Sequence, residues 1–175
     1  MSVFAGPFAI AACLLAIAGF AKAAQPAATA GALAALGLPH RRWMVRAGGV
    51  AEAVLACAAL VTGDEILTIL VAASYVGFAV FVAAALSKGT PLSSCGCFGK
   101  IDTPPHPLHL ALNLLAACAA IGMASDGGAS IGDVIAAQPM AGLPFALLVA
   151  IGVAAAGLTM TSLPRTLAVA RGRRA

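Results

Sequence analysis

Cys95 and Cys97 stand one residue apart in the segment SSCGCFGKIDTPPHPLH, residues 93–109, and are the residues of this chain best suited to chemistry. A thiol pair outside hydrocarbon is reactive and prone to oxidation. Gly96 between them can adopt backbone conformations closed to other residues, so the two sulfurs can reach bonding distance in a very small ring. Such a ring is strained and closes too short a loop to stabilise the fold much. The spacing therefore favours a disulfide that is exchanged over one that is structural.

This segment has three interpretations, of which the exchanged disulfide is the first and a metal site is the second. Lys100 is near enough in sequence to favour a thiolate at one of the cysteines. Two thiols and two imidazoles would also suit tetrahedral zinc or a copper centre, although C-x-C is tighter than the usual C-x₂₋₄-C of structural zinc. That set is Cys95, Cys97, His106 and His109. In the third interpretation the cysteines are incidental residues of a turn-rich loop in a membrane scaffold. A quinone is conceivable as a cofactor, but no residue indicates one specifically.

The elements that must position these residues are membrane spans. The chain has 175 residues, of which 62% are hydrophobic and 9% charged, and its mean hydropathy is +1.02. A bilayer core of about 30 Å needs roughly 20 apolar residues per helix. The predicted fold is an all-α, polytopic transmembrane bundle in one integral membrane domain, residues 1–175, with a four-helix core and a fifth C-terminal span. The candidate spans are 3–21, 43–62, 65–86, 108–124 and 143–163.

Three shorter segments complete this prediction. No basic residue precedes the first span, so it is expected to be a retained helix and not a cleaved signal peptide. Residues 25–42 are too short to cross a bilayer and predict an interfacial helix ending near Pro39. Residues 125–140 are Gly-rich and acidic, which predicts a loop with one short helical turn.

Charge predicts the orientation of the bundle. The connection after the first span and the C-terminal segment are basic. The connections after the second and fourth spans carry only acidic charges. Lysine and arginine favour the cytoplasm, which predicts an inner-membrane protein with its N-terminus outside, its C-terminus cytoplasmic and the cysteine segment on the cytoplasmic side. These charges sit in two small clusters beside hydrophobic spans, with Trp43 as the one aromatic residue among them, so the expected partner is the lipid bilayer and not nucleic acid. The basic residues are Lys22, Arg41, Arg42, Arg46, Arg165, Arg171, Arg173 and Arg174, and the acidic ones Asp64, Glu65, Asp126 and Asp133.

Glu52 lies near the middle of the second span. An ionisable group at that depth is costly unless it faces the bundle interior and finds a partner. Asn113 and Tyr75 are the candidate partners, and Gly48 and Gly49 would let a neighbouring helix approach closely. The carboxylate is then either a structural hydrogen-bonding group or one that handles protons or contacts substrate.

The remaining cysteines and histidines have plainer interpretations. Cys13, Cys57 and Cys118 lie inside spans, where a lone thiol acts as a small hydrophobe, and they are expected to pack. His106 and His109 are either residues at the level of the lipid headgroups or proton donors.

Several of these segments together resemble a family. GFAK at 19–22, AATAGALAALGLP at 27–39, Glu52, CGCFG at 95–99 and Asn113 are similar to the MauE branch of the DoxX-like membrane proteins. The resemblance implies a multi-pass helical bundle that helps to mature the small, disulfide-rich subunit of methylamine dehydrogenase. Cys95 and Cys97 would be the exchanging pair, supported by Gly96, Lys100, Glu52 and Asn113. Leu112 stands where the resemblance leads one to expect an arginine, so no role of an Arg–Asn pair carries over.

The predicted function is thus thiol–disulfide exchange in methylamine metabolism, with a thioredoxin-like protein or an exported client as partner. Whether the protein is an oxidoreductase or a maturation factor without turnover stays open. Disulfides form outside the cell, whereas the charges place this pair inside. Electrons would then pass outward from a cytoplasmic donor, and Cys57 and Cys118 are the candidate acceptors within the spans.

Overall fold

The structure is a computed structural model that describes residues 2–88 and 105–162. Cys95, Gly96, Cys97 and Lys100, on which the redox prediction rests, lie outside the described residues. Within them the chain is helical, and five helices are long and apolar enough to cross a membrane, which confirms the predicted class of fold. These helices are α1 (Ala5–Ala24), α3 (Arg42–Thr62), α4 (Glu65–Ser87), α5 (Pro107–Ser125) and α7 (Leu143–Thr161).

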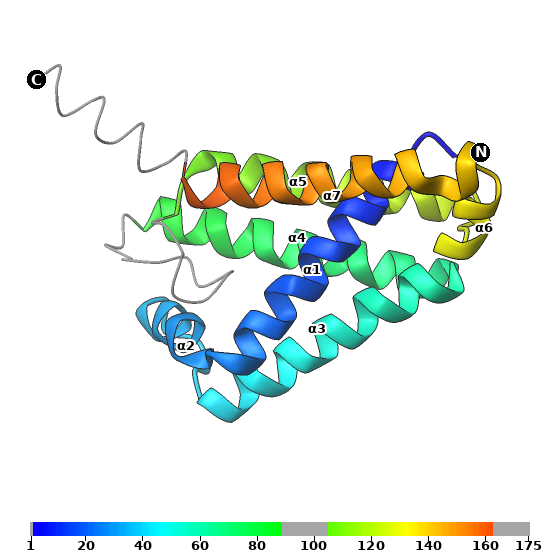
Figure 1. The fold of residues 1–175 in the computed structure, drawn as a ribbon. Coiled ribbons are helices and arrows are strands. Elements are labelled where there is room, and N and C mark those ends of the chain that lie inside the picture. The colour runs from blue at the N-terminus through cyan, green and yellow to red at the C-terminus, as the bar shows by residue number, and fades with distance from the viewer. Residues whose placement is uncertain (1, 89–104, 163–175) are drawn as a thin grey trace, which may run out of the picture.

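The two shorter segments also form helices. The ten residues of α2 (Pro26–Ala35) follow α1 directly, and Figure 1 shows them beside the end of the bundle, where an interfacial helix is expected. In the connection between α5 and α7, α6 (Ile131–Ala136) precedes a 3₁₀ turn at Pro139–Gly142. The Ser130 hydroxyl accepts a hydrogen bond from the Asp133 amide and so caps α6.

The tight turn between α3 and α4 is specified by three consecutive residues. The backbone of Gly63 is left-handed, with φ of 66°, and ends α3. Asp64 then caps α4, because its carboxylate accepts the Leu67 amide hydrogen at 2.9 Å. The Thr62 hydroxyl accepts a hydrogen bond from the Asp64 amide at 3.1 Å and stabilises the turn. This connection forces α3 and α4 to be antiparallel neighbours.

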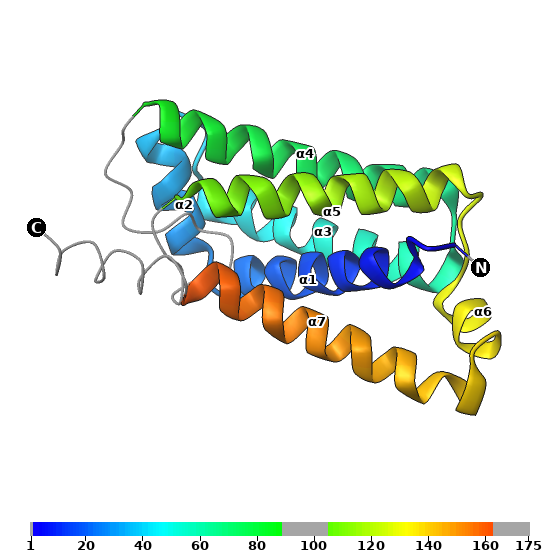
Figure 2. The same cartoon turned by 90° about the horizontal axis from the view of Figure 1, so that it is seen from above.

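Helix α1 runs through the centre of the bundle, between α3 on one side and α5 and α7 on the other (Figures 1 and 2). Its buried side chains are mostly alanines, and they meet alanines of α3 and α5. Small residues suit a membrane bundle because lipid supplies no hydrophobic drive, so close van der Waals contact must hold the helices together. The Tyr75 hydroxyl on α4 donates to the Ala11 carbonyl on α1 at 2.6 Å and joins these helices within the core.

Helix α7 is peripheral. It packs mainly on α1, and among its described side chains Met160 alone is buried. Pro144 stands in its first turn, where the missing N–H is tolerated. Most of the α7 surface is therefore available to lipid.

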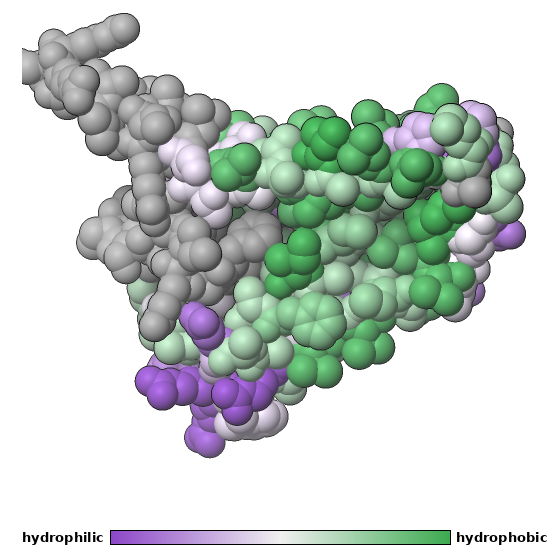
Figure 3. Space-filling view, viewed as in Figure 1, coloured by the Kyte–Doolittle hydropathy of each residue, from purple (hydrophilic) through white to green (hydrophobic). Residues whose placement is uncertain are grey.

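Apart from Lys22 and Glu52, the described charged residues lie toward the two ends of the bundle. The end that carries α2, the start of α3 and the finish of α4 and α7 is called here the basic end, with Arg41, Arg42 and Arg46. The N-terminus and α6 lie at the opposite, acidic end (Figure 1). Between them Figure 3 shows mainly apolar side chains on the face in view. The described acidic residues outside the spans or at their edges are Asp64, Glu65, Asp126 and Asp133.

Candidate functional site

Two helices carry the same short pattern, a glycine followed three residues later by a charge. In α1 it is Gly19-Phe-Ala-Lys22, and in α3 it is Gly49-Val-Ala-Glu52. The glycines meet where the helices cross: a Cβ added to Gly19 would lie 2.5 Å from the Gly49 carbonyl oxygen, and one added to Gly49 would lie 2.6 Å from the Gly19 oxygen. Such distances are far inside van der Waals contact, so the two backbones touch directly.

The charges three residues on face each other because positions i and i+3 share one side of a helix. Lys22 Nζ forms an ion pair with Glu52 Oε2, and the two side chains are 7% and 21% exposed. The same ammonium lies 4.2 Å from the centre of the Phe78 ring on α4, which is a cation–π contact. Three helices thus converge on one internal salt bridge.

An open groove lies on one side of this pair. It has a volume of about 420 Å³ and is bounded by residues of α2, α3 and α4. Lys22 and Glu52 contribute to its wall together with the aromatic rings of Phe78 and Phe81, and Gly48 and Gly77 line it without a side chain. The exposed fraction of the carboxylate therefore faces a mostly apolar groove of the bundle.

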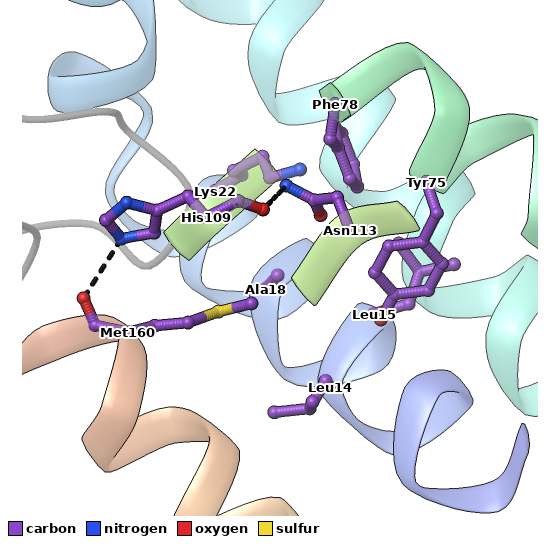
Figure 4. Close-up of a pocket in the computed structure, with 9 residues that line it drawn as sticks. All are labelled: Leu14, Leu15, Ala18, Lys22, Tyr75, Phe78, His109, Asn113 and Met160. Atoms are coloured by element: carbon purple, nitrogen blue, oxygen red, sulfur yellow. Dashed lines mark hydrogen bonds between the residues drawn. The ribbon is translucent and has the colours of Figure 1, made fainter. Parts of the chain in front are cut away.

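A small void of about 20 Å³ lies on the other side of Lys22. A space of this size holds about one water molecule. Figure 4 shows Lys22 and Asn113 pointing toward each other here, with Phe78 and Tyr75 from α4 beside them. Lys22 thus lies between the open groove and this internal void.

Asn113 and His109 extend this region toward the basic end. The Asn113 side-chain amide donates to the His109 carbonyl at 2.8 Å, one turn back along α5. The His109 ring is 2% exposed, and its Nε2 is 3.0 Å from the Met160 carbonyl of α7 (Figure 4). His109 therefore joins α5 to α7, while the Asn113 amide bonds within α5.

The capping arrangement at the start of α5 fixes the tautomer of His109. The His106 backbone N–H donates to His109 Nδ1 at 3.2 Å, so Nδ1 accepts and Nε2 carries the hydrogen given to Met160. Both ring nitrogens are engaged in this way, and binding a metal would require the ring to give up one of these bonds. Within residues 2–88 and 105–162, no three metal-ligating side chains come together.

The structure corrects two sequence-based expectations. The partner of Glu52 in the ion pair is Lys22, which the sequence analysis had treated as a topology signal, and not Asn113 or Tyr75. Gly49 makes the close helix contact, whereas nothing lies within 4 Å of a Cβ added to Gly48. The repeated glycine-to-charge spacing was the signal that could have revealed the pair.

The thiols inside the spans also differ from expectation. Cys57 and Cys118 are exposed on the outer surface of α3 and α5, and Cys13 alone is partly buried. They do not pack in the core because each falls on the outward face of its helix. The structure therefore places neither Cys57 nor Cys118 in the helix packing that a relay through the interior would use.

Comparison with known proteins decides the family. The model of the methylamine utilisation protein MauE matches residues 2–125. The chain belongs to the MauE family. This match spans α1 to α5, and so includes the ion pair, the groove, Asn113 and the C-x-C segment, while α6 and α7 lie beyond it. No curated protein and no solved structure matches the chain. As a MauE protein it is a multi-pass membrane protein linked to methylamine utilisation.

Proposed function

We propose that this MauE protein is a membrane-embedded factor that exchanges disulfides through Cys95 and Cys97 while an exported protein of methylamine utilisation matures. The observation that carries the proposal is the CGC sequence itself, within the part of the chain that matches the family and between two spans. By the resemblance noted above, the client would be the small subunit of methylamine dehydrogenase.

The described residues on either side of this segment support the proposal, because they form hydrogen bonds with other helices of the bundle. Lys88, which follows α4, reaches the Leu36 carbonyl at the end of α2 at 3.4 Å. His106 caps α5, and His109 joins α5 to α7. The described residues that flank the C-x-C segment are therefore attached to the bundle on both sides.

The proposed chemistry is an exchange of two electrons. A thiolate of the pair attacks a client disulfide, forms a mixed disulfide and releases one client thiolate. The second cysteine then attacks the mixed disulfide, which leaves Cys95 joined to Cys97 and the client reduced by two electrons. A thioredoxin-like dithiol would return the pair to its reduced form and itself become a disulfide. The reverse sequence oxidises the client.

The same proposal assigns the sides of the membrane. Lysine and arginine favour the cytoplasm, so we place the basic end there, in the inner membrane, with the N-terminus outside. Lys22 does not contribute to this bias because Glu52 neutralises it inside the bundle. The assignment therefore rests on the arginines. A membrane-impermeant thiol reagent should label Cys95 and Cys97 only after the inner membrane is opened, and labelling in intact cells would contradict it.

Trapping tests the exchange. In a Cys97→Ser variant, Cys95 can attack a disulfide but cannot resolve it, so a mixed disulfide with the client or with a thioredoxin-like protein should accumulate. Non-reducing gels and mass spectrometry of the purified variant would identify the trapped protein. Cys57→Ser and Cys118→Ser are the matched controls, because these thiols are exposed but lie within spans.

Two outcomes would contradict the redox proposal. If neither Cys95→Ser nor Cys97→Ser traps a partner, and both thiols remain open to alkylation under oxidant, the pair does not exchange. If the purified protein instead holds stoichiometric zinc or copper that is lost in Cys97→Ser and His106→Ala, the metal interpretation replaces it.

A further inference from the structure

A second hollow lies at the basic end, apart from the groove beside the ion pair. Its volume is about 680 Å³, and it lies between the junction of α1 with α2 and the first turns of α3. Arg42 and Arg46 line it together with Trp43, and these three residues provide its charge and its aromatic surface. Neither the proposed disulfide exchange nor the Lys22–Glu52 pair uses it.

The two guanidinium groups make this hollow suited to an anion. Arg46 Nε donates to the Ala23 carbonyl at 3.0 Å, which fixes the orientation of its planar group at the wall. No carboxylate lines the hollow. Among the described residues the salt bridge is that of Lys22 with Glu52, so neither arginine is paired with a described carboxylate. Arginine binds phosphate oxygens with paired, charge-assisted hydrogen bonds, so phosphate is the chemistry that this wall fits.

The first turn of α2 adds donors on the facing wall. Gln25 precedes this helix without a side-chain cap, and Pro26 follows as its first residue. The N–H groups of Ala27 and Ala28 have no acceptor within the helix, and both residues line the hollow. They complement the arginines and do not by themselves make a site.

The outer surface of α3 indicates that the anion is part of a lipid. Trp43, which lines the hollow, is 65% exposed. Val50 and Val54 follow it on the same side of the helix and are 50% and 62% exposed. Tryptophan at the membrane interface and a following apolar strip are what a headgroup and its acyl chains would contact. We propose that Arg42 and Arg46 bind the phosphate of an anionic phospholipid whose chains lie along α3.

Binding of defined lipids to the full-length protein tests this site. Purified protein in neutral detergent would be titrated with short-chain phosphatidylglycerol, phosphatidylcholine or inorganic phosphate and followed by native mass spectrometry. Phosphatidylglycerol should bind more tightly than phosphatidylcholine. An arginine that contacts the lipid phosphate contributes about 1 kcal/mol, so Arg42→Gln or Arg46→Gln should weaken the binding of phosphatidylglycerol about fivefold and the double variant about twenty-five-fold.

Arg41→Gln is the matched control, because Arg41 is exposed and adjacent but does not line the hollow. Its affinity for phosphatidylglycerol should stay within about twofold of the parent. Ala27→Glu tests the site without removing an arginine: a carboxylate in the first turn of α2 suits the helix but should repel the phosphate.

Three results would overturn the assignment. Equal affinity for phosphatidylglycerol and phosphatidylcholine would show that the site does not recognise the charge of the lipid headgroup. An Arg41→Gln loss as large as that of the double variant would show diffuse attraction to the whole basic end. Inorganic phosphate binding as tightly as phosphatidylglycerol would mean a site for the free anion. Folding of each variant is checked by its helical circular dichroism, and Ala27→Glu decides the case if an arginine variant unfolds.

Discussion

Glu52→Gln should be among the most destabilising single substitutions in this protein. It leaves the Lys22 ammonium, whose side chain is 7% exposed, inside the bundle without its carboxylate. Removing one partner of a buried ion pair typically costs about 3–5 kcal/mol, because the other charge stays buried and uncompensated. Lys22→Met should cost less, because the Glu52 side chain is 21% exposed and borders the open groove. Reversible denaturant unfolding of detergent-solubilised protein measures both.

A double variant separates structure from function at this pair. Lys22→Met combined with Glu52→Leu replaces both charges with apolar side chains and should recover most of the stability lost in Glu52→Gln. If the double variant is as unstable as Glu52→Gln, the two residues are not coupled as the structure indicates. If it is stable but a Cys97→Ser derivative no longer traps a partner, the pair acts in function as well as in folding.

Gly19→Ala should separate α1 from α3. The new methyl group would lie 2.5 Å from the Gly49 carbonyl oxygen and 2.7 Å from the Ala53 nitrogen, both backbone atoms that cannot rotate away. Overpacking of this kind costs about 1–3 kcal/mol, and Gly19→Val should cost more. Because Lys22 lies one turn farther along α1, the same displacement should weaken its contact with Glu52. The free energy of unfolding would be measured for each variant.

Two glycines of the same bundle serve as controls. Nothing lies within 4 Å of a Cβ added to Gly48 or Gly77, and both are in helices. Gly48→Ala and Gly77→Ala should therefore be neutral, or stabilising by up to about 1 kcal/mol through helix propensity. A Gly19→Ala variant as stable as Gly48→Ala would contradict the close crossing of α1 and α3.

The helices could be predicted from the sequence because long apolar runs with polar breaks are a local signal. Their ends are harder to place: α1 continues to Ala24, beyond residue 21 where the first candidate span stops. Hydropathy treats Lys22 as the boundary of a span, but the helix carries it into the protein interior, where Glu52 and Phe78 replace water. Whether a lysine is at an interface or buried depends on its tertiary neighbours.

The candidate site could be predicted only in part, because it also depends on tertiary neighbours. Glu52 could be identified alone, since a carboxylate in the middle of a span needs a partner. Choosing that partner requires knowing which helices touch and how each is rotated, and hydropathy specifies neither. His109 shows the same limit, because its contact with Met160 joins residues 51 positions apart and beyond the family match.

The matched spacing in α1 and α3 restricts how these helices can change length. A residue inserted between Gly19 and Lys22 would rotate the ammonium by about 100° around the α1 axis while leaving the glycine contact in place. The same holds between Gly49 and Glu52. Insertions and deletions should therefore be absent from both four-residue segments in other MauE chains that keep the pair. Where lysine is lost in such a chain, the acidic residue should be lost with it.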